Sequence, residues 1–305
     1  MVAIARAERD TLRVPRDLLQ VARPGQWPKN ILVVPLAVLD VKVWYPSLLW
    51  HLSWAVAVFT VAAVLVYTVN DLADRRYDSA NPHKWHRPIA SGRISARMAA
   101  GFAAAQLVLL VGLLSLQPWA WAWPVVAYLL LNAAYTLGLK HAPLLDVFLV
   151  AAGFGLRLML GYVVVGTAVA SWLMTCVFSL CLLLTVGKRR HELATTGNVH
   201  RPALRGYTVP LIDQLMVLSA VIAAGTYLLY LRTEAPLGEY GTLAAALLAP
   251  LALFALFRYL QLVIVGGGGG DPVRILLRDP ALVVNSVLWA GLTGAFLLVS
   301  RLPPG

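Results

Sequence analysis

The chain has 305 residues, of which 60% are hydrophobic and 13% charged, and its formal net charge is +11. Soluble domains carry a smaller apolar share, so this composition excludes a soluble enzyme or binding module. Apolar runs of about 18 residues or more recur, and each is long enough to cross ~30 Å of hydrocarbon as a helix. The sequence therefore predicts an all-α, polytopic membrane protein.

The chain begins with an arm that is charged throughout. Residues 1–29 lack the apolar core of a signal peptide, and the stretch PRDLLQVAR within them predicts a short amphipathic helix on the membrane interface. Residues 30–305 are expected to form a single catalytic domain of nine transmembrane helices. The predicted spans are 30–48, 50–70, 96–117, 119–137, 144–166, 170–187, 209–231, 240–263 and 280–300.

The basic residues are distributed unevenly between the two predicted sides. Of the 25 Lys and Arg, only Lys42, Arg232 and Arg301 fall on the far side, and Arg157 lies within a span. By the positive-inside rule, the N-terminus and the large polar loops face the cytoplasm, and the C-terminus lies outside a plasma membrane crossed several times. Part of this charge is explained by topology and anionic lipid alone. Because it is spread over loops, we expect no nucleic-acid partner.

An acidic cluster ends the second predicted span. Its side chains share one face of a helix that turns by about 100° per residue; they are Tyr67, Asp71, Asp74 and Asp78. Carboxylates so close repel one another unless a cation lies among them, and oxygen ligands suit Mg²⁺. We expect the three aspartates to bind Mg²⁺ with help from Asn70. The alternative is a salt-bridged surface helix in which Asp71 pairs with Arg75.

A loop rich in Pro and Gly, NPHKWHRPIASG, follows this cluster. It carries Lys84 and Arg87, and cations beside a metal–carboxylate cluster suit a polyphosphate substrate. His83 and His86 are read as polar residues of the interface, because their spacing alone does not predict zinc.

These segments resemble the UbiA superfamily of intramembrane prenyltransferases. The resemblance rests on N-D-x-x-D-x-x-x-D at 70–78 with HRPIASG at 86–92, on RPxQWxKN at 23–30 and on Tyr135-x-x-x-Leu139-Lys140. It implies a helical bundle around a central cavity open to lipid, with Mg²⁺ on Asp motifs and diphosphate as the leaving group.

The segment after the sixth predicted span departs from the superfamily pattern. Where a second Asp-rich motif is expected, the chain has GKRRHELATTGNVHRPALRGYT, in which Glu192 is the single acid. Lys188, Arg189 and Arg190 would suit a substrate pair with several phosphates. This resembles a branch of the superfamily that transfers 5-phosphoribosyl from phosphoribosyl diphosphate to polyprenyl phosphate for cell-wall arabinan synthesis. The alternative is ordinary positive-inside charge, with Lys188 paired to Glu192.

Further polar residues lie in or beside the spans. We expect Lys29, Lys140 and Arg157 to bind phosphate. The alternative for Arg157 is that its hydrogen bonds serve the packing of the helices. Tyr67 and Tyr135 complete the expected substrate site. Asp146 either seats Lys140 or the metal, or caps its helix. Cys176 and Cys181 are read as small core residues, and the run Gly266–Gly270 as a flexible cytoplasmic linker.

The sequence thus predicts a Mg²⁺-dependent phosphoribosyltransferase. It is compatible with a homo-oligomer. Its expected catalytic residues are Asp71, Asp74, Asp78, Lys84 and Arg87. The main alternative is transfer of a prenyl group from its diphosphate to an aromatic acceptor. A membrane transporter is the other alternative, and it would require inverted repeats that the sequence lacks.

Overall fold

The computed structural model describes residues 14–34, 47–81, 84–197 and 202–300. Within these ranges every regular element is a helix. The chain forms two compact units: unit 1 comprises Met1–Leu36, Tyr45–Leu137 and Leu156–Val165, and unit 2 comprises Ala37–Trp44, Gly138–Gly155 and Gly166–Gly305. The prediction of one catalytic domain at 30–305, preceded by an arm, stays a prediction.

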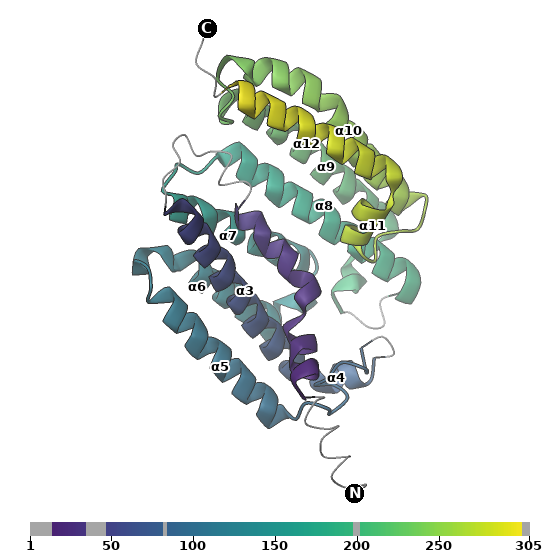
Figure 1. The fold of residues 1–305 in the computed structure, drawn as a ribbon. Coiled ribbons are helices and arrows are strands. Elements are labelled where there is room, and N and C mark those ends of the chain that lie inside the picture. The colour runs from purple at the N-terminus through teal and green to yellow at the C-terminus, as the bar shows by residue number, and fades with distance from the viewer. Residues whose placement is uncertain (1–13, 35–46, 82–83, 198–201, 301–305) are drawn as a thin grey trace, which may run out of the picture. The chain divides into compact units, whose positions relative to one another are not determined.

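Unit 1 is built around one long apolar helix, α3, which packs against α5 and α6 (Figure 1). A helix at 14–22 precedes it where the interfacial helix was predicted. α5 begins after Ser95, whose hydroxyl accepts a hydrogen bond from the Met98 N–H at 3.2 Å and so satisfies a free helix-end donor. The elements are η1 (Pro24–Leu32), α3 (Leu48–Ala73), α4 (Arg75–Ser79), α5 (Ala96–Leu114), η2 (Trp119–Trp121), α6 (Trp123–Leu137) and the second half of α7 (Leu145–Val165).

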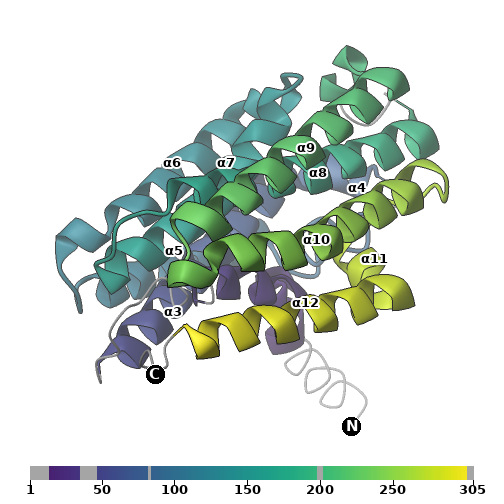
Figure 2. The ribbon, with the colours of Figure 1, turned by 90° about the horizontal axis from the view of Figure 1, so that it is seen from above.

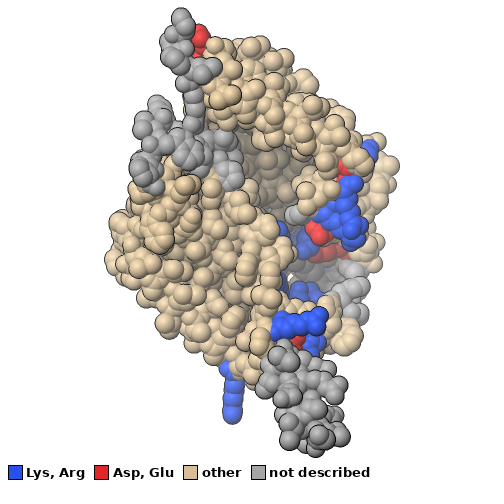
Figure 3. Space-filling view, viewed as in Figure 1, with Lys and Arg blue, Asp and Glu red and all other residues tan. Residues whose placement is uncertain are grey.

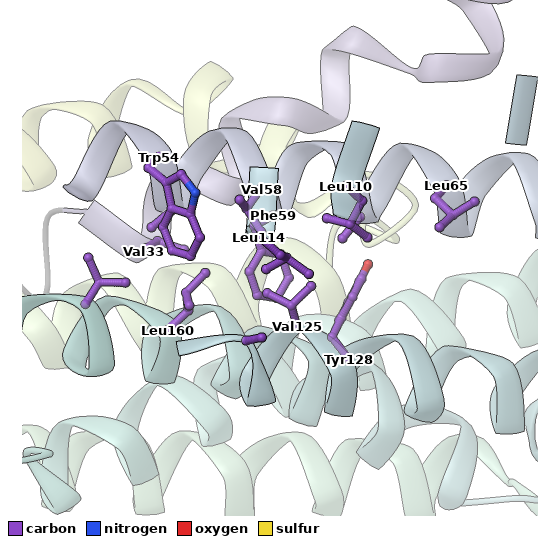
Figure 4. Packing of buried hydrophobic residues seen from close by; sticks show 14 residues of the cluster. Val33, Trp54, Val58, Phe59, Leu65, Leu110, Leu114, Val125, Tyr128 and Leu160 are labelled. Atoms are coloured by element: carbon purple, nitrogen blue, oxygen red, sulfur yellow. The ribbon is translucent and has the colours of Figure 1, made fainter. Parts of the chain in front are cut away.

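The core of unit 1 lies between α3, α5, α6 and α7 (Figure 4). Phe59 and Tyr128 meet at its centre, with ring centroids 4.8 Å apart. Val58, Val125 and Leu160 are fully buried beside them. In a membrane such packing stabilises helices through close van der Waals contact, because lipid is as apolar as the core.

Unit 2 is a bundle in which α9 packs against both α8 and α10, and α10 against α12 (Figure 2). Its core combines apolar side chains of α8, α9 and α10, among them Leu183, Met216 and Val263. The elements are η3 (Leu139–His141), the first half of α7, α8 (Ser171–Thr196), η4 (Pro202–Gly206), α9 (Val209–Thr233), η5 (Gly238–Tyr240), α10 (Gly241–Ile264), α11 (Pro272–Arg278) and α12 (Pro280–Val299).

The protein is a multi-pass membrane protein. Seven of the described helices are long and apolar enough to cross a membrane: α3, α5, α7, α8, α9, α10 and α12. α6 coincides with another predicted span but has only 15 residues, and most of the predicted span 30–48 lies outside the described residues. The count of nine is therefore not confirmed. On the face in Figure 3 most side chains are neither acidic nor basic, as contact with lipid requires.

Two smaller expectations have different outcomes. Cys176 and Cys181 are buried in α8, as predicted for core residues. The run Gly266–Gly270 is not the flexible linker that was expected, because the Gly267 carbonyl lies 3.1 Å from Nδ1 of His191. A Cβ on Gly269 would lie only 2.7 Å from the Gly187 carbonyl oxygen. Glycine lets this segment pack directly against α8.

Candidate active site

The acidic cluster lies where α3 ends and the chain turns into α4. The helical bonds continue through the junction, since the Asp74 N–H donates to the Asn70 carbonyl at 2.9 Å and the Asp78 N–H to the Asp74 carbonyl at 2.8 Å. Asp71 and Asp78 are only 4% exposed, whereas Asp74 is half-buried. The predicted acidic face therefore exists, and its first and last carboxylates are the buried ones.

One guanidinium joins the two buried carboxylates. Nη1 of Arg87 lies 3.1 Å from Oδ1 of Asp71 and 2.8 Å from Oδ2 of Asp78. Nζ of Lys84 lies 3.4 Å from the other oxygen of Asp78. A second arginine, Arg23, donates to Oδ1 of Asp71 at 2.5 Å. Asp71 pairs with Arg23 and Arg87 and not with Arg75, so the ion pair of the surface-helix alternative is not the one formed.

The loop before α5 folds back on itself and so fixes Arg87. The Ser91 N–H donates to the Arg87 carbonyl at 2.9 Å, and the Ile94 N–H donates to the Pro88 carbonyl at 3.0 Å. Ile89 and Ile94 are buried against Val21 of the helix at 14–22. This apolar anchoring explains why HRPIASG needs its isoleucine as well as its charges.

The oxygen atoms gathered at the acidic cluster are of the chemical type that binds Mg²⁺. Asp71 and Asp78 supply buried carboxylate oxygens, and the Asn70 amide oxygen lies 3.4 Å from the Thr136 hydroxyl. The Arg87 guanidinium between the two acids shows that this position accepts a cation. Among the described residues no three His, Cys, Asp or Glu side chains form a ready-made metal group. The predicted group of three aspartates is therefore not assembled in this structure, and a Mg²⁺ ion here would rest on one or two carboxylates with water and phosphate.

Arg157 lies in the interior of unit 1 and is 5% exposed. Its Nε donates to Oδ1 of Asn30 at 2.9 Å, and one Nη donates to the Tyr128 hydroxyl at 3.3 Å. The guanidinium carbon also lies 5.0 Å from the ring centroids of Phe59 and Tyr128. These contacts hold the planar cation in one orientation, as in the alternative in which its hydrogen bonds serve the packing of the helices, and phosphate binding by Arg157 stays a prediction.

The remaining expected site residues of unit 1 have contacts of their own. The Arg23 guanidinium stacks 5.1 Å from the Tyr67 ring centroid. Nζ of Lys29 donates to the Gln26 side chain at 2.5 Å, within η1. Tyr135 is half-buried on α6, next to the Thr136 that contacts Asn70. Unit 1 thus carries ten of the expected residues: Lys29, Tyr67, Asn70, Asp71, Asp74, Asp78, Lys84, Arg87, Tyr135 and Arg157.

Unit 2 carries the other expected residues, and two of its arginines are held in ion pairs. Nε of Arg189 lies 2.7 Å from Oδ2 of Asp146, and its Nη1 lies 2.7 Å from Oε2 of Glu192. Nε of Arg190 lies 2.6 Å from Asp213, and its Nη1 donates to the Val263 carbonyl at 3.1 Å. The structure pairs Glu192 with Arg189, and the alternative pairing of Glu192 with Lys188 stays a prediction. Of the basic run 188–190, Lys188 is the exposed member, and Lys140 is half-buried in η3.

Sequence reasoning assigned no role to Arg23, Asn30 and Tyr128, whose contacts are given above, nor to Tyr207, whose hydroxyl donates to Oδ1 of Asp146 at 2.8 Å. Arg23 and Asn30 belong to the motif at 23–30, so the motif was the available signal. Tyr128 and Tyr207 carry no local signal, because each acquires its role from a partner far along the chain.

Comparison with known proteins gives consistent results. A model of the UbiA prenyltransferase family matches residues 32–265. The chain is 31% identical to the decaprenyl-phosphate phosphoribosyltransferase of Mycolicibacterium smegmatis over 93% of each chain. It is 32% identical to the protein of that name from Mycobacterium tuberculosis, over 91% of this chain and 93% of the other.

The fold has a counterpart among solved structures. A UbiA homolog from Archaeoglobus fulgidus bound to DMAPP and Mg²⁺ matches with a TM-score of 0.68, covering 93% of this chain and 99% of that one. At 17% identity this likeness concerns the fold alone.

Proposed function

The chain belongs to the UbiA prenyltransferase family, and on that premise we propose that it transfers 5-phosphoribosyl from phosphoribosyl diphosphate to decaprenyl or another polyprenyl phosphate, releasing diphosphate. The observation that carries the proposal is the likeness to two decaprenyl-phosphate phosphoribosyltransferases along nearly the whole chain. The product would serve synthesis of a cell-wall arabinan precursor.

Asp71 and Asp78 would hold Mg²⁺, with Asn70 and Asp74 as further oxygen donors. Mg²⁺, when bound, supplies positive charge that stabilises the departing diphosphate.

Arg87, Arg23 and Lys84 have a second task in this proposal. Without substrate they neutralise the buried carboxylates. When a metal ion and a diphosphate enter, these cations can turn from the carboxylates to phosphate oxygens, so that charge stays balanced at every stage. Arginine suits this exchange because its planar fork binds carboxylate and phosphate alike.

The reaction needs positioning and charge more than proton transfer. The bond from the anomeric carbon to diphosphate breaks, the diphosphate keeps the electron pair, and an oxygen of polyprenyl phosphate forms the new bond. Because that oxygen is already anionic, no strong general base is required. Lys29, Arg157 and the two tyrosines Tyr67 and Tyr135 would hold the remaining substrate groups.

In unit 2, Lys140 and Lys188 would bind phosphate. We retain Arg189, Arg190 and Glu192 as residues of the substrate region. Their ion pairs nevertheless favour a supporting task over direct contact.

The proposal also covers location. Polyprenyl phosphate would enter from the lipid of the plasma membrane, and the active site would face the cytoplasm, where phosphoribosyl diphosphate is made. The positive-inside distribution of Lys and Arg supports this orientation.

The test is transfer by the purified protein in lipid nanodiscs. Radiolabelled phosphoribosyl diphosphate with decaprenyl phosphate should yield labelled lipid in the presence of Mg²⁺ and none in excess EDTA. Asp71→Asn should lower the rate at least 100-fold, since it removes one buried carboxylate charge. The matched control is Asp17→Asn. Asp17 lies on the helix at 14–22 and also forms an ion pair with an arginine, Arg93.

Two outcomes would overturn the proposal. Product from a prenyl diphosphate and 4-hydroxybenzoate, with none from phosphoribosyl diphosphate, would identify a conventional prenyltransferase. Full activity in EDTA would contradict the metal site.

A further inference from the structure

A chain of hydrogen bonds in unit 2 joins three segments that are distant in sequence. The Tyr207 hydroxyl accepts from the Leu144 N–H at 2.8 Å and donates to Oδ1 of Asp146 at 2.8 Å. Oδ2 of Asp146 accepts from Nε of Arg189 at 2.7 Å, and Arg189 continues to Glu192. These hydrogen bonds thus connect the start of α7, the segment between η4 and α9, and the C-terminal part of α8.

The network is shielded from solvent. Asp146 is 0% exposed and Arg189 4%. Burial, together with the neighbouring Asp146 carboxylate, raises the pKa of Tyr207 above its usual range, so the hydroxyl keeps the proton that it donates. A buried carboxylate needs its lone pairs satisfied, and Asp146 has both oxygens paired.

The same network holds a strained backbone. Leu144 has φ +66°, a left-handed conformation that is strained for a bulky residue. Its N–H is the one that Tyr207 accepts. Beside it Pro143 lies against Gly206, where a Cβ would come within 2.3 Å of the proline ring. The segments 138–144 and 202–207 are therefore pressed together and held by the Tyr207 hydroxyl.

Lys140 lies in this held segment, four residues before Leu144, within η3. The Asp146 N–H also donates to the Ala142 carbonyl at 3.2 Å, so the segment is fixed at two points near its end. A change that frees Leu144 therefore removes one of the two points that fix the end of the segment carrying Lys140.

We propose that Tyr207 and Asp146 are positioning residues that hold the Lys140 segment for phosphate binding. Arg189 and Glu192 belong to the same hydrogen-bond network, called the latch below, and are not direct phosphate ligands. This inference rests on the proposed function, because Lys140 is taken to bind a phosphate of the phosphoribosyl diphosphate.

The first variant is Tyr207→Phe, which removes one hydroxyl and keeps the ring in the core. It leaves the Leu144 N–H and one Asp146 oxygen without their partner. We expect the KM for phosphoribosyl diphosphate to rise about tenfold with kcat within threefold, the size of effect that loss of a buried hydrogen bond produces. Asp146→Asn should act in the same direction.

The structure offers a matched control in Tyr259→Phe. Tyr259 is also buried in unit 2, and its hydroxyl has no hydrogen-bond partner among the described residues. This variant should leave both KM and kcat unchanged. An equal rise in KM with Tyr259→Phe would overturn the proposal, since loss of any buried hydroxyl would then suffice.

A double-mutant cycle decides whether Tyr207 acts through Lys140. In a Lys140→Ala background, Tyr207→Phe should change the KM less than about twofold, because the group being positioned is gone. Independent tenfold losses in the two backgrounds would contradict the latch.

Hydrogen exchange supplies a readout without turnover. Amides of residues 139–147 should exchange faster in Tyr207→Phe than in the unmodified protein or in Tyr259→Phe, and equal protection would overturn the proposal. If the proposed function fails, the unmodified protein will transfer no phosphoribosyl group, yet the exchange comparison still reports on the latch.

Discussion

Arg87 lies at the centre of the candidate active site. A single nitrogen of its guanidinium contacts both buried carboxylates, and Lys84 and Arg23 add charge from either side. Because both carboxylates are buried, their charges need a counter-ion close by. In the proposed mechanism the same position accepts the metal, so Arg87 would serve both the folded state and the reaction.

We predict that Arg87→Ala makes the protein depend on Mg²⁺ for stability. The two aspartates would face each other without their shared counter-ion, which should lower the free energy of unfolding by about 2 kcal/mol without metal. Added Mg²⁺ should raise the Tm of this variant more than that of the unmodified protein. The measurement is thermal unfolding with and without Mg²⁺.

Arg93→Ala is the control for this prediction. Arg93 pairs with Asp17 on the helix at 14–22, and its side chain is 41% exposed. We expect little loss of stability and no added response to Mg²⁺, because exposed ion pairs contribute little. Identical Mg²⁺ responses in the two variants would contradict the assigned role of Arg87.

At the scale of elements, short connections determine how the helices of unit 2 are held. Between α10 and α11 the glycine run lies against α8, and between α11 and α12 a single aspartate both caps a helix and pairs with an arginine. Such connections carry few apolar contacts, so individual backbone angles and charges decide their stability.

Gly269→Ala should destabilise the α10–α11 connection. Gly269 has φ +118°, a conformation that L side chains rarely adopt, and the new Cβ would meet the Gly187 carbonyl oxygen. We expect a loss of about 1–3 kcal/mol, seen as a lower Tm. Gly294→Ala in α12 is the control: a Cβ there meets nothing within 4 Å, and alanine favours a helix. A Tm that is unchanged in Gly269→Ala would mean that the segment is a free linker after all.

Asp279 should contribute stability that depends on pH. The hydrogen bond from Arg258, with help from the Leu282 N–H, lowers the pKa of Asp279 below its usual range. The contribution is therefore present above the unfolded pKa of about 3.9 and is lost as pH falls through the lower folded value. Asp279→Asn keeps the helix cap but removes the ion pair, so its Tm should lie below that of the unmodified protein at pH 7 and approach it in acid.

Asp271→Asn is the matched control, since Asp271 accepts a comparable cap bond from the Arg274 N–H at 3.3 Å. It should change the Tm little at either pH. A gap between Asp279→Asn and the unmodified protein that stays constant down to acid pH would exclude the ion pair as its cause.

At the scale of the whole molecule, the uneven distribution of Lys and Arg predicts the orientation in the membrane. The two cysteines are both buried, so added cysteines can report on sidedness without removing native ones. Tyr77 is 81% exposed at the acidic cluster, and Glu239 is exposed between α9 and α10. The positive-inside rule predicts that these two positions lie on opposite sides.

Tyr77→Cys should react with a membrane-impermeant maleimide in inverted vesicles and not in intact spheroplasts, and Glu239→Cys should show the reverse. The labelling of each variant on both preparations checks the proposed cytoplasmic active site. Labelling of both positions from the same side would refute the predicted topology.

The sequence by itself determined the membrane setting, the helical class and the place of the acidic cluster, because these depend on local properties. Apolar length predicts a spanning helix, and the spacing of Asp71 and Asp78 predicts a shared face, from neighbouring residues alone. Motif spacing was also enough to place Lys84 and Arg87 beside that face, although as cations expected to bind phosphate.

Only the tertiary structure decided which charges meet. Asp71 pairs with Arg23 and Arg87, which are 48 and 16 residues away, and not with its helical neighbour Arg75. Arg189 forms an ion pair with Asp146, which is 43 residues away, and the Tyr207 hydroxyl donates to Asp146 from 61 residues away. The physical reason is that helical periodicity acts over a few turns, whereas an ion pair between segments exists only once packing has closed the chain between them.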